Sequence, residues 1–367
     1  MFFTHLFEAD IYYSMSCIPM SLRLMLDEAA IKLHLKTWNQ FSADEQWDLA
    51  LHPVETSDQK AQFTQRVSEL IVGKTHQPIS QLEPLKRPTP WEITGAIPPE
   101  ILDRAKNLSE EIDPLNWKNF HTQQRFALVK LAKSGHDSNN FLPALREFRH
   151  ALAEKIKVSE PHGLQNGFAA LDAVVLAGGK SSRFGSDKTQ LPASGAGPQR
   201  GGSDLTARAA SLLTSLNFRK VWVSSPTPRH LPCATDLPDD VPDLGPLGGI
   251  ATALLRAPYG VFVIAADMPA ASHELVASVV NAWDGQALAV APKTGAGTAD
   301  ESWEPLCAVY TKTALPALYR AACKKELGLQ RRLNEWAART VELPPHLQAQ
   351  LTNINTVEDW QKFQQQQ

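Results

Sequence analysis

The chain is poor in the residues that mark several common classes of protein. It has 4 cysteines, Cys17, Cys233, Cys307 and Cys323, and none of them forms a CxxC pair or a metal-ligand spacing. We therefore expect neither a disulfide framework nor a cysteine-based zinc site, and reduced thiols are the simplest interpretation. The sequence also lacks any run that approaches the ~18 apolar residues of a membrane helix.

An excess of charge of either sign is missing as well. The net charge is -3 at pH 7 and the pI is about 6.4, so nothing draws the whole chain toward nucleic acid or an anionic membrane. The N-terminal stretch MFFTHLFEADIYY carries acidic residues where a secretory signal would be basic. We expect a cytoplasmic protein whose partners are small molecules, with no nucleic acid and no membrane among them.

The length and the apolar content allow more than one domain. Apolar residues make up 43% of 367 residues, which is enough for a sizeable core in each of two domains. A polar stretch that contains Pro161 and Gly167 separates two differently patterned halves. We predict a first domain at residues 1–155, a linker at 156–170 and a second domain at 171–367.

The first half has the periodicity of helices and few signals of strands. Apolar residues recur at steps of three and four within residues 22–33, 63–70 and 141–152, which places each series on one face of a helix. Ser42 and Glu45 have the spacing of a capping box, which starts a helix. The pattern predicts a small all-α domain.

Three sequence segments of the first half resemble those of a known family. They are CIPMSLRLMLDEAAIKLHLKTWNQF at residues 17–41, PTPWE at 88–92 and QQRFALVKLAKSGHDSNNFLPALREF at 123–148. Together they resemble the family called nitrate reductase associated protein, over almost all of residues 5–150. The resemblance implies a connection to nitrate assimilation and names no catalytic residue.

In the second half, signals of strands and helices alternate. Apolar runs at residues 173–176, 221–223, 261–265 and 288–291 are separated by amphipathic stretches at 205–216 and 275–279. Such alternation predicts an α/β domain with a mainly parallel, Rossmann-like sheet that is flanked by helices. Ligands of such sheets bind at the carboxyl ends of the strands, so functional residues are expected just after them.

A glycine loop follows the first of these strands, in the sequence LAGGKSSRFGSDK at residues 176–188. Gly178 and Gly179 have no Cβ, so the backbone can turn sharply and bring its N–H groups against a phosphate, while Arg183 and Lys188 add positive charge. The alternative is an ordinary turn with solvated cations. The spacing fits neither the P-loop nor the dinucleotide fingerprint, so we interpret the loop as a phosphate site of another nucleotide fold.

A second candidate is Asp267, which follows the strand at residues 261–265 in the word AADMP. A carboxylate at a strand end that faces a triphosphate is a usual anchor for Mg²⁺. The alternative is a capping or turn residue. We predict Mg²⁺ as the cofactor and Asp267 as its ligand.

The loop LAGGKSSRFGSDK resembles the signature of the nucleotidyltransferases typified by molybdenum cofactor guanylyltransferase, a family that attaches GMP to molybdopterin. EPLCAVY at residues 304–310 and NINTVEDW at 353–360 resemble later motifs of that family. The resemblance implies GTP and molybdopterin as substrates, and it implies that Asp267 binds both Mg²⁺ and the nucleotide.

The same resemblance extends to LPDDVPDLGPLGGI at residues 237–250. It implies that Gly245 and Gly248, in a tight loop that feeds a helix, line the nucleotide site and that Asp239 contacts the base, with Asp240 as the neighbouring alternative. Ser224 stands where the family often has an asparagine, which is a departure from the pattern. The implied nucleotide-binding set is Leu176, Ala177, Gly178, Gly179, Lys188, Ser224, Asp239, Gly245, Gly248 and Asp267; the catalytic set is Arg183, Lys188 and Asp267; the acceptor-binding pair is Asn353 and Asn355.

The implied reaction is a direct attack by the acceptor phosphate on the α-phosphorus of GTP, which releases pyrophosphate. The residues themselves select neither guanine over cytosine nor molybdopterin over a sugar phosphate, so a cytidylyltransferase or a sugar-phosphate nucleotidyltransferase stays open. The first half supplies a link to nitrate reductase, whose bacterial forms carry the guanylylated cofactor. A non-catalytic cofactor carrier or chaperone for nitrate reductase is the alternative from another class.

Overall fold

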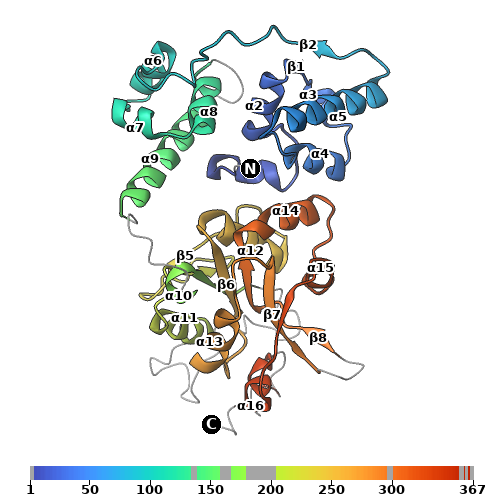
Figure 1. Cartoon of the computed structure of the whole chain (residues 1–367). Coiled ribbons are helices and arrows are strands. Elements are labelled where there is room, and N and C mark those ends of the chain that lie inside the picture. Colours follow the sequence, from blue (N-terminus) through green and yellow to red (C-terminus); the bar gives the residue numbers. More distant parts are fainter. Residues whose placement is uncertain are drawn as a thin grey trace. The chain divides into compact units, whose positions relative to one another are not determined.

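The computed structural model describes residues 4–133, 139–157, 167–178, 204–295, 301–354, 359 and 363. The chain divides into two compact units, Met1–Pro161 and His162–Gln367 (Figure 1). Helix α9 continues to Lys157 and helix α10 occupies Gly167–Ala170, so both ends of the predicted linker are helical. No helix within the described ranges is long and apolar enough to cross a bilayer.

The first unit is built from helices, as the periodicity predicts. They are η1 Leu6–Glu8, α1 Ala9–Tyr12, α2 Met20–Glu28, α3 Leu35–Trp38, α4 Ala43–Ala50, α5 Ser57–Thr75, α6 Pro99–Asn107, α7 Pro114–Asn119, α8 Thr122–Ala132 and α9 Phe141–Lys157. The predicted capping box is confirmed, because the Ser42 hydroxyl accepts a hydrogen bond from the N–H of Glu45 and the Glu45 side chain accepts one from the N–H of Ser42. Helices α6, α7, α8 and α9 surround a core that is rich in fully buried aromatic side chains.

Two expectations for this unit need correction. The helix predicted over residues 22–33 ends at Glu28, because Ala30 adopts a left-handed conformation with φ of 54° that no helix continues. The chain then forms strand β1, Ile31–Lys32, which pairs antiparallel with β2, Ser80–Gln81. The unit is therefore helical with one short strand pair rather than purely α.

The second unit is an α/β sheet with helices on both faces. Its strands are β3 Asp172–Leu176, β4 Val221–Ser224, β5 Thr235–Asp236, β6 Gly260–Ala265, β7 Ala289–Thr294, β8 Ser302–Trp303, β9 Cys307–Thr311 and β10 Arg339–Val341. Its helices are α10, α11 Leu205–Ser215, α12 Gly245–Arg256, α13 His273–Asn281, η4 Lys312–Ala314, α14 Leu315–Cys323, α15 Leu329–Glu335, α16 Pro345–Gln348 and η5 Ala349–Leu351.

The strand order is β10-β7-β9-β6-β3-β4-β5, with β8 paired to β7. The pairs β10–β7, β6–β3, β3–β4 and β4–β5 are parallel, whereas β9 lies antiparallel between β6 and β7. The prediction of a mainly parallel sheet flanked by helices is confirmed. The antiparallel β9 has no counterpart in the pattern of alternating elements.

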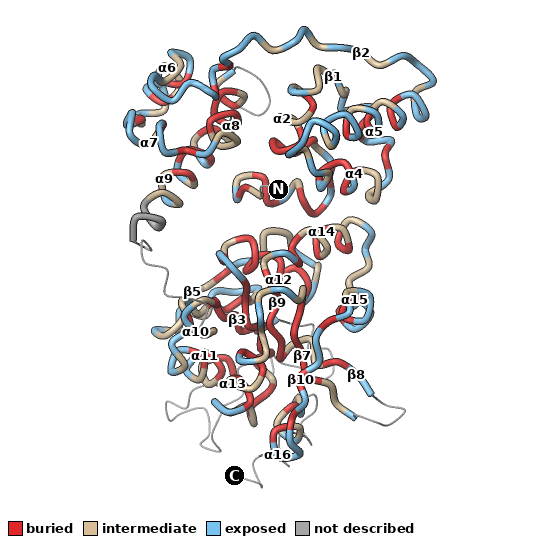
Figure 2. Tube along the Cα trace, in the orientation of Figure 1, coloured by how far each residue is buried: buried red, intermediate tan, exposed pale blue. Residues whose placement is uncertain are grey.

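The buried strands explain why the sheet lies between layers of helices. Every residue of β3, β6 and β9 is buried, which is typical of strands covered on both faces (Figure 2). Helix α12 packs on β3 and β6 together with α14, while α11 and α13 contact β3, β4, β7 and β9. The carboxyl ends of β3, β4 and β6 lie level with one another, because Leu176 pairs with Ser224 on one side and with Ala265 on the other.

Candidate active site

The end of β3 lies between the ends of β4 and β6, and hydrogen bonds hold the three together just beyond the sheet. The N–H of Ala177 donates to the carbonyl of Ser224 at 2.8 Å, and the N–H of Ala266 donates to the carbonyl of Leu176 at 3.0 Å. Gly178 therefore leaves the sheet between Ser224 and the chain that leads to Asp267. The strand edge predicted to hold the ligand does bring these residues together.

Part of the predicted site lies outside the described residues. Gly179, Arg183, Lys188 and Asn355 belong to the ranges 179–203 and 355–358, for which the structure gives no placement. The phosphate-binding role of the two cations and the acceptor role of Asn355 stay predictions. The described part of the site is thus its strand edge, the start of α12 and the segment around Asn353.

Ser224 and Asp239 form a hydrogen-bonded pair at this edge. The Ser224 hydroxyl donates to Oδ1 of Asp239 at 2.7 Å. Burial raises the pKa of the Asp239 carboxyl and the neighbouring charge of Asp240 raises it further, while the hydrogen bond from Ser224 opposes both effects. The pair places an acceptor oxygen beside the start of α12, where a ligand with N–H donors is favoured.

Asp240, the alternative to Asp239, is engaged elsewhere. Its carboxylate pairs with both terminal nitrogens of Arg256 at 2.7 and 3.0 Å, and its N–H donates to the hydroxyl of Thr252 at 3.0 Å. Both partners lie on α12, so Asp240 fastens the loop to that helix. Of the two carboxylates, Asp239 is the one that is available to a ligand at the strand edge.

The GPLGG segment, predicted to be a loop before a helix, is the first turn of helix α12 itself. Gly245 has φ of 58°, a conformation that favours glycine. A Cβ on Gly248 would lie 2.9 Å from Cβ of Leu244 and 3.6 Å from Oδ2 of Asp239. Because the helix begins directly at the strand edge, the positive end of its dipole favours a bound anion there.

Gly249 shows why this helix needs a small residue in its second turn. A Cβ at this position would lie 2.8 Å from Cδ2 of Leu176 and 2.9 Å from the hydroxyl oxygen of Ser224. The close approach of α12 to β3 and β4 therefore depends on the missing side chain. The same approach brings Ser224 within reach of Asp239.

Asp267 follows β6, and a second carboxylate lies close to it. Glu304 stands just before β9, which runs antiparallel to β6 with Cys307 opposite Ile264. The start of β9, just after Glu304, therefore lies beside the end of β6, just before Asp267. Burial raises the pKa of Glu304 to about 7, and the negative charge of Asp267 contributes to the shift.

The chain segment around Asn353 also reaches this edge of the sheet. The N–H of Ile354 donates to the backbone carbonyl of Asp267 at 2.9 Å. This bond places Asn353 beside the strand edge, and its side-chain Oδ1 is buried with no hydrogen-bond partner among the described residues. The structure brings Asn353 to the same end of the sheet as Asp267, as the sequence predicts.

Oxygen ligands from carboxylates suit Mg²⁺, which commonly takes one or two of them and completes its shell with water and phosphate oxygens. Asp267 and Glu304 offer such a pair, and a bound cation would favour the ionised form of Glu304, whose pKa is raised by burial and by the charge of Asp267. Within the described ranges, no cluster of three or more His, Cys, Asp and Glu side chains is placed to hold a metal. The two carboxylates fit the ligand preference of a magnesium ion.

Sequence reasoning did not select Glu304 as a site residue. It lies in the word EPLCAVY, where a glutamate directly precedes a buried apolar run. Its proximity to Asp267 follows from the antiparallel insertion of β9, and no local pattern predicts that order of strands. The sequence feature that could have indicated Glu304 is its position directly before a buried apolar strand.

Two family profiles match the chain. Residues 2–148 match the conserved nitrate reductase-associated protein family, and residues 173–341 match the MobA-like NTP transferase domain. A probable molybdenum cofactor guanylyltransferase from Nostoc sp. is 30% identical over 199 residues, which cover 52% of this chain and 88% of that relative. One from Chloroflexus aggregans is 31% identical over 208 residues, which cover 52% and 91%.

The chain belongs to the MobA-like NTP transferase family. It is a nucleotidyltransferase, and both resemblances predicted from the sequence are confirmed. Among solved structures, molybdopterin-guanine dinucleotide biosynthesis protein A from Archaeoglobus fulgidus aligns with a TM-score of 0.42 and 22% identity, over 53% of this chain and 97% of that one. A 2-C-methyl-D-erythritol 4-phosphate cytidylyltransferase from Thermus thermophilus aligns with a TM-score of 0.40 and 17% identity, over 53% and 98%.

The stretch matched to the MobA-like transferase domain contains the strand edge described above. Gly178, Ser224, Asp239, Asp267 and Glu304 all lie within residues 173–341. Asn353 lies beyond the matched stretch and joins the site through the bond between Ile354 and Asp267. The candidate site thus draws on both the matched stretch and the segment that follows it.

Proposed function

We propose that this chain is a molybdenum cofactor guanylyltransferase, which transfers GMP from GTP to molybdopterin. An oxygen of the terminal phosphate of molybdopterin attacks the α-phosphorus, the bond from the α-phosphorus to the bridging oxygen breaks, and pyrophosphate leaves. The observation that carries the proposal is the Asp267–Glu304 carboxylate pair beside Gly178 at the strand edge of a MobA-like transferase. Relatives at 30% and 31% identity are named as probable guanylyltransferases of this cofactor.

In this proposal Asp267 holds Mg²⁺ and Glu304 assists it. The ion, when bound, neutralises charge on the triphosphate and on the leaving pyrophosphate. Gly178 and Gly179 bring backbone N–H groups to the phosphates, and the start of α12 at Gly245 and Gly248 adds the favourable end of a helix dipole.

The remaining predicted residues have complementary tasks in the same proposal. Arg183 and Lys188 bind the phosphates as cations, and their charge stabilises the transition state. Asn353 and Asn355 hold the acceptor so that its phosphate is in line with the bond that breaks. The buried Oδ1 of Asn353, without a partner among the described residues, is an acceptor that a bound molybdopterin would satisfy.

The Ser224–Asp239 pair supports guanine as the base. Guanine presents a ring N–H and an amino group side by side, and a carboxylate accepts both. Cytosine has a single amino donor beside a ring acceptor, so the same carboxylate would face a lone pair. The hydroxyl of Ser224 donates a hydrogen bond to Oδ1 of Asp239 and fixes the orientation of that carboxylate.

Nucleotide choice is the experiment that tests this function. Purified chain is incubated with molybdopterin, Mg²⁺ and GTP, CTP or ATP, and the release of pyrophosphate is measured for each. We expect turnover with GTP and much less with CTP and ATP. Preference for CTP would contradict the proposed base specificity, and binding of molybdopterin without turnover of any nucleotide would favour a carrier.

We propose further that the reaction takes place in the cytoplasm and serves the maturation of nitrate reductase. The support is the match of residues 2–148 to the conserved nitrate reductase-associated protein family. The full chain, immobilised and exposed to a lysate of nitrate-grown cells, should retain nitrate reductase or a protein that handles its cofactor. Retention of neither would count against this role.

A further inference from the structure

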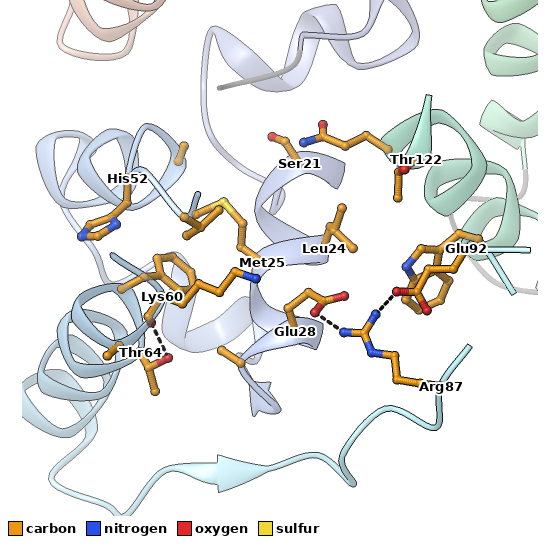
Figure 3. Close-up of a pocket in the computed structure, with 17 residues that line it drawn as sticks. Ser21, Leu24, Met25, Glu28, His52, Lys60, Thr64, Arg87, Glu92 and Thr122 are labelled. Carbon is orange, nitrogen blue, oxygen red and sulfur yellow. Dashed lines mark hydrogen bonds and ion pairs between the residues drawn. The ribbon is translucent and has the colours of Figure 1, made fainter. Parts of the chain in front are cut away.

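The first unit contains a pocket that the transferase proposal does not use. Its volume is about 480 Å³, which lies within the range of small-molecule sites. One wall is a face of helix α2 that carries Ser21, Leu24, Met25 and Glu28 (Figure 3). Residues from α5 and from the end of α4 form one side, and residues 87–92 with the start of α8 form the other.

The lining mixes apolar and polar side chains, and the apolar ones include aromatic rings from opposite sides. Phe63 on α5 and Trp91 before α6 are almost completely buried, at 1% and 5% exposure. Leu24 and Met25 on α2 line the same pocket. Such a lining suits the flat faces of a ring compound.

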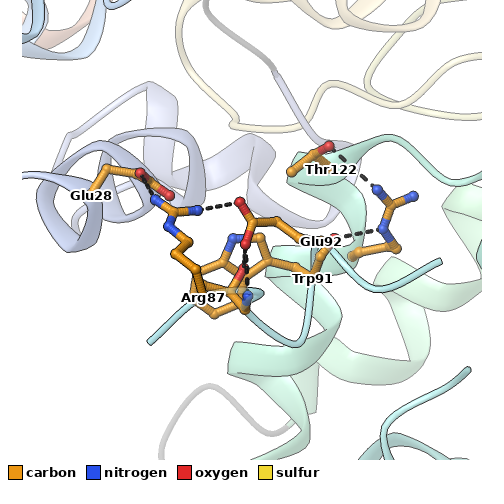
Figure 4. A network of polar contacts seen from close by, with 7 residues as sticks. Glu28, Arg87, Trp91, Glu92 and Thr122 are labelled. Atoms are coloured by element: carbon orange, nitrogen blue, oxygen red, sulfur yellow. Dashed lines mark hydrogen bonds and ion pairs between the residues drawn. The ribbon is translucent and has the colours of Figure 1, made fainter. Parts of the chain in front are cut away.

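The wall around Trp91 is held in place by polar contacts. The Arg125 guanidinium donates to the carbonyl of Trp91 at 2.7 Å and reaches the hydroxyl of Thr122 at 3.4 Å. Arg87 forms ion pairs with both Glu28 and Glu92 (Figure 4). These contacts join α2, residues 87–92 and α8 into one preformed boundary.

The charges of the lining balance. The lining holds two cations, Lys60 and Arg87, and two carboxylates, Glu28 and Glu92. Both carboxylates pair with Arg87, which leaves it no spare charge for a ligand. Lys60 is exposed to solvent, and the remaining side chains that face the proposed ligand, Ser21, Leu24, Phe63, Trp91 and Gln123, carry no charge. An ion held among these side chains would lose water without gaining a counter-charge, so they favour an uncharged ligand.

Two polar atoms of the lining lack partners. The side chain of Ser21 is 2% exposed and its hydroxyl forms no hydrogen bond among the described residues, and Oε1 of Gln123 is likewise buried and unbonded. Buried polar atoms without partners are rare because each has lost its hydrogen bonds to water and gained none in return. Gln123 Oε1 requires a donor, and the Ser21 hydroxyl can donate to an acceptor.

We propose that this pocket binds an uncharged, flat ring compound whose polar edge carries an N–H donor and a carbonyl acceptor, as a lactam does. The ring packs between Phe63 and Trp91 over Leu24. The ligand carbonyl accepts from Ser21, and the ligand N–H donates to Oε1 of Gln123. This site is independent of the transferase site and gives the first unit a binding function of its own.

A matched pair of compounds tests the proposal on the full chain. 2-Quinolinone has the lactam edge, and 1-methyl-2-quinolinone has the same ring with the N–H blocked. We expect 2-quinolinone to raise the Tm of the unfolding transition of the first unit. In calorimetric titration it should bind about tenfold more tightly than its N-methyl analogue. Failure of both compounds to bind at millimolar concentration, or equal affinity for the two, would overturn the proposal.

Variants of Ser21 and Gln123 test the two proposed hydrogen bonds to the ligand separately. Gln123→Met should abolish the preference for the N–H compound, and Ser21→Ala should weaken 2-quinolinone about tenfold. Without compound, Ser21→Ala should melt at the same or a higher temperature, because it removes an unpaired buried hydroxyl. Ser68→Ala, on α5 outside the pocket, is the control and should bind as the wild type does. Unchanged affinity in Ser21→Ala would also refute the proposed contact.

Discussion

At the scale of single residues, Glu304 makes the stability of the second unit depend on pH. Its pKa is about 7 in the folded chain because of burial and the charge of Asp267, against an ordinary 4.5. Between these values the folded chain keeps a proton that the unfolded chain releases. The free energy of unfolding therefore falls as the pH rises from 4.5 to 7 and is level above that range.

Glu304→Gln should remove this dependence, because the amide resembles the protonated carboxyl and does not titrate. We expect the variant to have a higher Tm than the wild type at pH 8 and a similar Tm at pH 4, measured by calorimetry without Mg²⁺. The exposed Glu342 gives the matched control Glu342→Gln, which should follow the wild type at both pH values. A Glu304→Gln variant that is less stable at pH 8 would contradict the assigned repulsion.

Asp239 combines a stability cost with a proposed binding role. Burial and Asp240 raise its pKa, so the ionised form is disfavoured in the free protein. Asp239→Asn should raise the Tm slightly at pH 8 and increase the KM for GTP about tenfold, since the amide accepts one donor of guanine less well. Steady-state kinetics and thermal melts check both effects. An unchanged KM would remove Asp239 from the base site.

The sequence supports some of these residues better than others. Asp267 is predictable because a carboxylate directly after a buried strand lies at the ligand edge of any parallel sheet. The resemblance favours Asp239 over Asp240, and the pairing of Asp240 with Arg256, sixteen positions away, supports this choice only in the fold. Glu304 escaped prediction because Asp267 follows β6, which pairs with β9 only after the chain has reversed its direction.

At the scale of elements, the start of α12 determines the geometry of the strand edge. Gly249→Ala would place a methyl group 2.8 Å from Leu176 and 2.9 Å from Ser224, so helix and strands must separate. We expect a loss of about 1–3 kcal/mol in the free energy of unfolding and a higher KM for GTP, because Ser224 no longer orients Asp239.

Gly328→Ala is the control for this prediction. A Cβ at Gly328 meets nothing within 4 Å, so stability and KM should stay close to those of the wild type. Denaturant unfolding and initial-rate kinetics of the two variants make the comparison. Equal behaviour of the two alanine variants would show that the close approach of α12 has no role.

Local patterns predict most elements of this chain and miss their interruptions. The apolar run of β3 and the period of α5 are strong signals, and both elements occur where they are expected. The helix predicted over residues 22–33 stops early because Ala30 turns left-handed, and no glycine marks that turn. GPLGG has the composition of a loop, yet it begins α12, and its Gly249 allows the close packing of that helix against β3.

At the scale of the whole molecule, each compact unit has its own hydrophobic core. The core of the second unit joins β3, β6, α11 and α13, and that of the first joins α6, α8 and α9. Sequence patterns predict two domains from the change of periodicity, whereas their borders depend on how far α9 and α10 extend. The boundaries of the domains themselves stay a prediction.

Separate cores predict separable folding and catalysis. A fragment of residues 162–367 should unfold cooperatively and release pyrophosphate from GTP and molybdopterin with a KM for GTP within about twofold of the full chain. Calorimetry and initial rates on the fragment and the full chain make the comparison. A fragment that aggregates or has lost turnover would show that the first unit is needed by the second.

The central claim is that the strand edge around Asp267 catalyses guanylyl transfer, and the most direct test is product formation from GTP, Mg²⁺ and molybdopterin by wild type and Asp267→Ala. We predict that the wild type forms the guanine dinucleotide and pyrophosphate in equal amounts. Asp267→Ala should lose about 10²–10³-fold in rate and the control Asp103→Ala, at an exposed site on α6, should lose nothing. No dinucleotide from the wild type, or an undiminished rate in Asp267→Ala, would contradict the claim.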